Sequence, residues 1–85
     1  MEKSIYTKEY AVVLRLLRKA REESGITQVK LAKALGQSQS FVSKVELGDR
    51  RLDLVQLRTF LGKIGWKLSD FVSLFEAELA KKKLL

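Results

Sequence analysis

Apolar residues recur at intervals of three and four along most of this 85-residue chain, which places them on single faces of α-helices. Outside the centre of the chain, these stripes comprise Tyr10, Val13, Leu14 and Leu17; Leu54, Leu57, Leu61 and Ile64; and Leu68, Phe71, Val72, Phe75 and Leu79. The chain has no proline, so no residue removes a backbone donor inside a helix. The pattern therefore predicts an all-α chain.

The centre of the chain, residues 27–48, predicts two short helices joined by a tight turn. Thr27 is suited to cap the first helix and Ser38 the second, because each hydroxyl can accept a free backbone N–H. Gly36 lies between them, and a residue without Cβ enters the left-handed conformation that ends a helix at little cost.

The spacing within this stretch is typical of a helix-turn-helix. Two helices that cross at about 90–120° need a small residue at the crossing, and Ala32 supplies it. Val42 supplies the branched residue that faces it from the second helix, predicted at residues 38–47. The exposed side of that second helix then carries amide, hydroxyl and ammonium groups able to contact base edges, from Gln39, Ser40, Ser43 and Lys44.

From about residue 14 to about residue 72, the chain resembles the phage Cro and repressor family of bacterial transcription regulators. The resemblance is carried by the glycine turn, by TQ and SQS at the heads of the two motif helices, and by SKVELG at the end of the second. It implies a five-helix, lambda-repressor-like DNA-binding domain over residues 1–85, with the motif at about 27–48 and a C-terminal helix at about 68–82. Lys30 departs from the family pattern, since many members place there a glutamate that completes a capping box.

The resemblance also implies roles for four particular residues. Gln28 is expected to bond a DNA phosphate and to brace Gln39, the first glutamine of the recognition helix. Arg21 is expected to pair with Glu46 near the end of that helix and so to fix the angle between the first and third helices. Removal of one partner from such a partly buried pair costs several kcal/mol, so both residues are interpreted as structural rather than as DNA readers.

The second motif helix is predicted to lie in the major groove with its N-terminal end nearest the bases. Gln39 is the first candidate reader, because its amide can pair with both N7 and N6 of adenine. The hydroxyls of Ser40 and Ser43 are less selective, while Lys44 can reach either guanine or a phosphate.

Arg50 and Arg51 directly follow the recognition helix and are predicted to contact phosphates of the DNA backbone. The alternative is that both arginines lie in a solvated turn without contacting DNA. Phosphate contacts of this kind set the register of a protein on DNA without carrying sequence information directly. The candidate DNA-binding residues are Gln28, Ser38, Gln39, Ser40, Ser43, Lys44, Arg50 and Arg51.

Composition and charge further limit the classes of function that the chain can have. The net charge is +7, which favours a polyanionic partner such as double-stranded DNA. There is no cysteine and no histidine, which excludes disulfides, the usual zinc sites and the commonest general base. No cofactor or metal is therefore expected, and the chain is not expected to be an enzyme. No apolar run reaches the ~20 residues that span a bilayer, so a cytoplasmic location without a membrane partner is expected.

The expected assembly is a homodimer on a pseudo-palindromic operator, paired through the C-terminal helix. Leu74 falls off the apolar stripe of that helix and is predicted to be exposed in a monomer. The alternative function is a protein-interaction module, such as an antitoxin with a toxin-like partner, in which DNA binding is secondary. On that interpretation Val12, Leu16 and the apolar stripe of the C-terminal helix would hold the partner; otherwise Val12 and Leu16 would pack against the last helix.

Overall fold

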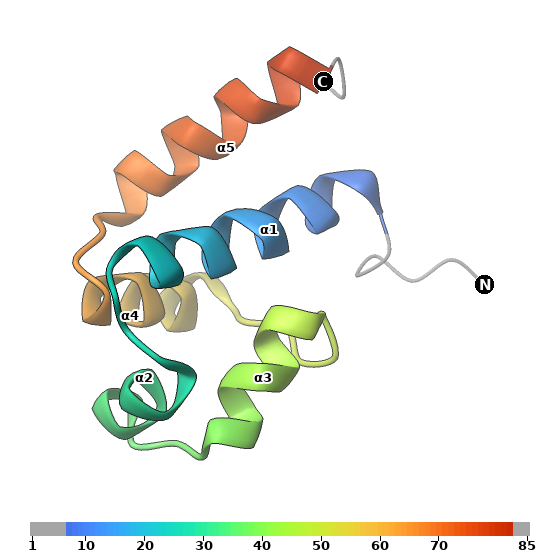
Figure 1. Cartoon of the computed structure of the whole chain (residues 1–85). Helices are drawn as coiled ribbons and strands as arrows, with labels where there is room; N and C mark the ends of the chain where they lie inside the picture. Colours follow the sequence, from blue (N-terminus) through green and yellow to red (C-terminus); the bar gives the residue numbers. More distant parts are fainter. Residues whose placement is uncertain (1–6, 83–85) are drawn as a thin grey trace.

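The computed structural model of the chain describes residues 7–82, and the remainder of the predicted 1–85 domain lies outside the described residues. Five helices follow one another, with no strand between residues 7 and 82 (Figure 1). Their bounds are α1 Lys8–Glu23, α2 Gln28–Leu35, α3 Gln39–Leu47, α4 Leu54–Lys63 and α5 Leu68–Lys82. The prediction of an all-α, five-helix fold is confirmed.

Polar side chains begin four of these helices, and two of them, Thr27 and Ser38, are the caps that the sequence predicts. A backbone N–H three residues further on donates to the side-chain oxygens of Thr7, Thr27, Ser38 and Asp53. Asp53 also donates its own backbone N–H to Gln56 Oε1 at 2.9 Å, so α4 begins with a reciprocal capping box. The caps satisfy backbone donors that would otherwise lack a partner at each helix start.

The long helix α1 is central to the packing. It contacts α3 on one side and α5 on another, while α2 contacts α3 and α4, and α4 contacts α5. In Figure 1, α1 and α5 run side by side, and α2 and α3 occupy the opposite end of the molecule. The core consists of Val12, Leu16, Leu17, Ala20, Leu31, Ala32, Val42, Val45, Phe60, Leu61, Ile64, Phe71 and Leu79.

The buried face of α1 differs from its predicted stripe. Val12 and Leu16 are fully buried, whereas Tyr10, Val13 and Leu14 are only partly buried. Because α1 packs between two other helices, its buried surface is wider than a single stripe. Packing of Val12 and Leu16 within the core is therefore confirmed, and a partner surface made of them is excluded.

The predicted exposure of Leu74 is wrong. Leu74 is partly buried and packs against the core, and it lines a small hollow between α1 and α5 together with Leu16. Val72, which the periodicity places on the buried stripe, is 42% exposed instead. The fifth helix is therefore rotated relative to the predicted face, because it must cover α1 as well as the corner at Trp66.

The stripe predicted for α4 is also partly wrong. Leu54 is 66% exposed in the first turn of the helix, although it falls in register with the buried Leu61 and Ile64. Phe60 is 1% exposed and is a core residue that the stripe leaves out. Periodicity identifies a helix face, but it does not show how far along the helix the neighbouring elements extend.

Candidate nucleic-acid interface

The two helices of the motif are held together by small and branched side chains, as predicted. Ala32 on α2 is 3% exposed, and Val42 and Val45 on α3 are fully buried. Gly36 ends α2 with φ of +68°, a conformation that suits glycine. Because this apolar side of α3 faces the body, its other side is open to solvent.

Beneath the motif lies the ion pair that the resemblance implied. Arg21 on α1 donates from Nε to Glu46 Oε2 at 2.6 Å and from Nη2 to Glu46 Oε1 at 3.0 Å. Its Nη1 donates to the carbonyl oxygen of Ile26 at 2.9 Å. The bonds to Glu46 raise the pKa of Arg21 against the opposing effect of burial. The two side chains are 9% and 3% exposed, so α1 and α3 are joined by a buried, bidentate contact.

This ion pair continues as a chain of hydrogen bonds to the surface. Gln28 Nε2 donates to Glu46 Oε1 at 2.9 Å, and Gln39 Nε2 donates to Gln28 Oε1 at 2.6 Å. The bond between the two glutamines is the brace that the resemblance implied. The bond from Gln28 to Glu46 was not expected, and no spacing in the sequence indicates it, because the two residues lie in different helices.

Several of the predicted site residues lie together on one side of α3. A hollow of about 390 Å³ is lined by Gln37, Ser38, Ser40, Phe41, Lys44, Asp49 and Arg50. Within it the Arg50 guanidinium lies 5.3 Å from the centroid of the Phe41 ring, a cation–π contact. The hollow therefore combines two cations with two hydroxyls beside the N-terminal end of α3, and Asp49 is the acidic group on its rim.

Four of the eight predicted site residues do not line this hollow: Gln28 and Gln39, which bond to each other, and Ser43 and Arg51. The Arg51 guanidinium lies 4.5 Å from the centroid of the Tyr10 ring, against α1. Ser43 is partly buried and does not line the hollow, although it shares α3 with Gln39. The two adjacent arginines, equivalent in the sequence, therefore have different surroundings.

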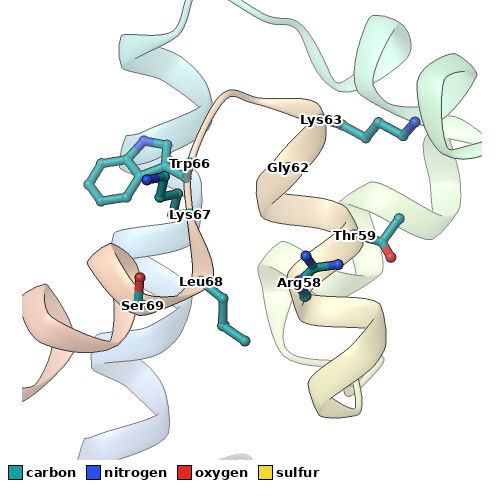
Figure 2. A pocket seen from close by; sticks show the side chains of 8 residues that line it. All are labelled: Arg58, Thr59, Gly62, Lys63, Trp66, Lys67, Leu68 and Ser69. Carbon is teal, nitrogen blue, oxygen red and sulfur yellow. The ribbon is translucent and has the colours of Figure 1, made fainter.

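A larger hollow of about 710 Å³ lies between α4 and α5 and shares no lining residue with the hollow beside α3 (Figure 2). Its lining comprises Arg58, Thr59, Gly62, Lys63, Trp66, Lys67, Leu68 and Ser69. In Figure 2, Leu68 points between the two helices, while Lys63 and Trp66 extend away in opposite directions. Because its cations do not converge, we assign no ligand site to this hollow. Between residues 7 and 82 no group of acidic side chains is placed to hold a metal ion.

A family model described as helix-turn-helix matches residues 17–65, which include α2, α3 and all four of the hydrogen-bonded residues Arg21, Gln28, Gln39 and Glu46. The chain belongs to the XRE-type helix-turn-helix family. A solved structure called an XRE-family like protein, from Pseudomonas syringae pv. tomato str. DC3000, is 44% identical with a TM-score of 0.78. The similarity covers 82% of this chain and 85% of that chain. No curated protein matches.

Membership of the XRE family confirms the resemblance to Cro and repressor proteins and has a direct functional meaning. Domains of this family are DNA-binding regulators and not enzymes, and this holds for the present chain. None of the described helices has the length and apolar character that a membrane crossing requires.

Proposed function

We propose that this XRE-family regulator reads specific DNA sequences by placing α3 in the major groove, with Gln39 as its principal reader. The observation that carries the proposal is the position of Gln39 in the exposed first turn of α3. One N–H of the Gln39 amide donates to Gln28. Among the described residues, no group bonds to the other N–H of Gln39 or to its Oε1. That remaining pair, one donor and one acceptor, is complementary to N7 and N6 of adenine.

The neighbouring groups supply the remaining contacts in this proposal. Ser40 and Ser43 offer hydroxyls to base edges, and Lys44 offers an ammonium to guanine or to a phosphate. Gln28, Ser38, Arg50 and Arg51 are proposed to contact the DNA backbone, which the N-terminus of α3 also favours through its free N–H groups. The net charge of +7 supports a strong electrostatic component of binding.

Substitution of Gln39 tests the proposed reader. Selection of bound duplexes from a random-sequence pool first gives the preferred site. Gln39→Ala should then weaken binding to that site by about 1–3 kcal/mol and relax the preference at one base pair of each half-site.

Gln37→Ala is the matched control, because it removes the same amide from the turn that precedes α3 and should leave base preference unchanged. Equal weakening of selected and random duplexes by Gln39→Ala would show that the reader is another residue.

We further propose that the protein binds as a two-fold dimer on a pseudo-palindromic operator. A single module of this size contacts too few bases to distinguish one operator among a genome's competing sites. Two copies double the contacts, with half-site centres separated by about 34–36 Å.

The surface through which two copies pair is proposed to lie at the C-terminal end of α3 and the N-terminal end of α4 rather than on α5. Phe71 and Leu79 of α5 are 2% and 5% exposed and belong to the core of a single copy. By contrast, Leu47, Leu54 and Val55 are each at least 66% exposed, at the end of α3 and in the first turn of α4. Interfaces remove such apolar side chains from water.

Sedimentation across a range of concentrations tests this surface. Leu54→Asp should weaken self-association, because it would place a charge in the proposed interface. Val72→Asp is the control, since it places the same charge on an exposed position of α5. If only Val72→Asp weakens pairing, the interface is on α5 as the sequence predicted. A wild-type protein that binds DNA as a monomer would exclude the dimer.

A main role in binding a protein partner is not favoured by the structure. That interpretation depended on Val12 and Leu16 as surface residues, and both are buried in the core. The apolar side chains of α5 are likewise largely turned toward the other helices. We therefore propose DNA recognition as the single main function.

A further inference from the structure

Hydrogen bonds link Arg21, Glu46, Gln28 and Gln39 into what we call the polar chain, and the order of donors and acceptors along it is fixed. Both oxygens of Glu46 accept hydrogen bonds from Arg21, and Oε1 also accepts from Gln28. An ionised carboxylate can only accept. Gln28 must therefore turn its NH₂ toward Glu46, which leaves its own oxygen to accept from Gln39.

The geometry points to Glu46 as a positioning residue for base recognition, one that sets which way the Gln39 amide faces through Gln28. This inference rests on the proposed function, in which Gln39 reads the base. In the arrangement observed, one N–H of Gln39 donates to Gln28, and its other N–H and its oxygen remain available to bond with DNA. Adenine presents one acceptor and one donor in the major groove, so this arrangement selects adenine.

The opposite arrangement would select a different base. If the Gln28 amide were reversed, its oxygen would face the Glu46 carboxylate, and two acceptors would meet without a hydrogen between them. The Gln28 NH₂ would then donate to the oxygen of Gln39. Gln39 would be left with both N–H donors for DNA, which fits the two acceptors N7 and O6 of guanine. The carboxylate at residue 46 excludes this state.

Burial makes the carboxylate effective in this role. The Glu46 side chain is 3% exposed, so water has little access to the oxygen that Gln28 contacts. Arg21 holds both carboxylate oxygens and is itself held by the carbonyl of Ile26. A mobile or hydrated carboxylate could accept from water instead and leave the Gln28 amide free to turn.

Replacement of Glu46 by glutamine removes this constraint with little change in shape. The new amide would offer a donor as well as an acceptor, so Gln28 could meet it in either orientation. We expect Glu46→Gln to reduce the preference for adenine over guanine at the base pair that Gln39 reads by at least about fivefold. Competition binding with duplexes carrying each of the four bases at that position, taken from the selected site, measures this ratio.

Gln28→Leu provides a second route that keeps the buried ion pair intact. It removes the amide that connects Glu46 to Gln39, so the same ratio should fall by a similar factor, whatever happens to overall affinity. The double variant Glu46→Gln/Gln28→Leu should lower the ratio no further than either single change, because both act through one amide. If Glu46→Gln does not fold, an unchanged ratio in Gln28→Leu would still overturn the inference.

A purely structural role of Glu46 would give a different result. Ser24→Ala is the control for lost stability, since the Ser24 hydroxyl contacts the carbonyls of Ala20 and Ile64, outside the polar chain. Ser24→Ala should leave the ratio unchanged. If Glu46→Gln and Gln28→Leu also keep the wild-type ratio while Gln39→Ala loses it, this inference is overturned and the proposed function stands. A ratio that survives Gln39→Ala overturns both.

Discussion

At the scale of single residues, a few polar side chains fix how the helices meet. Among the described residues, every buried side-chain nitrogen or oxygen has a hydrogen-bond partner. Ser24 joins the end of α1 to α4, and Arg21 joins α1 to α3. Such groups are costly to leave unpaired, so each contact tolerates only one relative placement of its helices.

The buried ion pair leads to a direct prediction about stability. Arg21→Ala should reduce the free energy of unfolding by about 3–5 kcal/mol, because it leaves the Glu46 carboxylate buried without its partner. Urea denaturation followed by circular dichroism would measure the loss.

Arg18→Ala is the matched control for this change. Arg18 pairs with Glu22 on the same helix, but their side chains are 64% and 53% exposed. Loss of that exposed pair should cost no more than about 1 kcal/mol. A similar loss for both arginines would mean that burial does not govern the contribution of Arg21.

At the scale of the elements, the helix ends can be predicted from the sequence far better than the helix faces. A cap depends on a hydroxyl or carboxylate three residues from its donor, which is local information, and Thr27 and Ser38 both cap as predicted. A buried face depends on where the neighbouring helices lie. The sequence therefore misplaced Leu74 and missed Phe60.

The same distinction holds for the candidate site. The helix-turn-helix and the Arg21–Glu46 pair could be predicted because they follow from a recognisable run of residues. The bond from Gln28 to Glu46 and the separate surroundings of Arg50 and Arg51 could not be predicted. They depend on the crossing angle of α2 and α3 and on the path of the connection into α4.

The glycine within α4 gives a prediction at this scale. A Cβ at Gly62 would meet no atom within 4 Å, and its backbone is helical. Gly62→Ala should therefore raise the free energy of unfolding by about 0.5–1 kcal/mol, chiefly because the unfolded chain loses conformational freedom. Thermal or urea denaturation would measure the gain.

Gly36→Ala is the contrasting variant. A Cβ there would also meet nothing within 4 Å, but φ is +68°. The left-handed conformation costs an alanine about 1–2 kcal/mol, so this change should destabilise the protein. Changes of the same sign at both positions would contradict the conformational explanation.

At the scale of the whole molecule, we expect positive charge and the exposed side of α3 together to determine how the protein binds DNA. The chain has 17 lysines and arginines against 10 acidic residues. Each phosphate that such a cation neutralises releases counterions, so affinity falls as salt rises. Charge should therefore govern affinity for any duplex, while the polar chain ending at Gln39 governs the choice among duplexes.

The two arginines after α3 separate these contributions experimentally. Arg50→Ala should weaken binding to all duplexes about equally and reduce the slope of log K against log salt by about one unit. Arg51→Ala should change the slope less, because its guanidinium lies against Tyr10 of α1, outside the hollow beside α3 that Arg50 lines. Titrations at several salt concentrations would measure both slopes. An unchanged slope for Arg50→Ala would favour the solvated-turn interpretation.

If Glu46 acts through Gln28 as proposed, we expect that retargeting this protein to a new DNA sequence will require coordinated substitutions. The oxygen of Gln28 has Gln39 as its donor, so any apolar replacement of Gln39 leaves that acceptor to water. Selection from a library that varies position 39 alone should therefore favour side chains able to donate to the Gln28 oxygen. Varying positions 28, 39 and 46 together would instead let selection choose the direction of the hydrogen-bond chain along with the side chain at its tip. We therefore expect these three positions to change together when sequence preference changes, although they are spread over two helices.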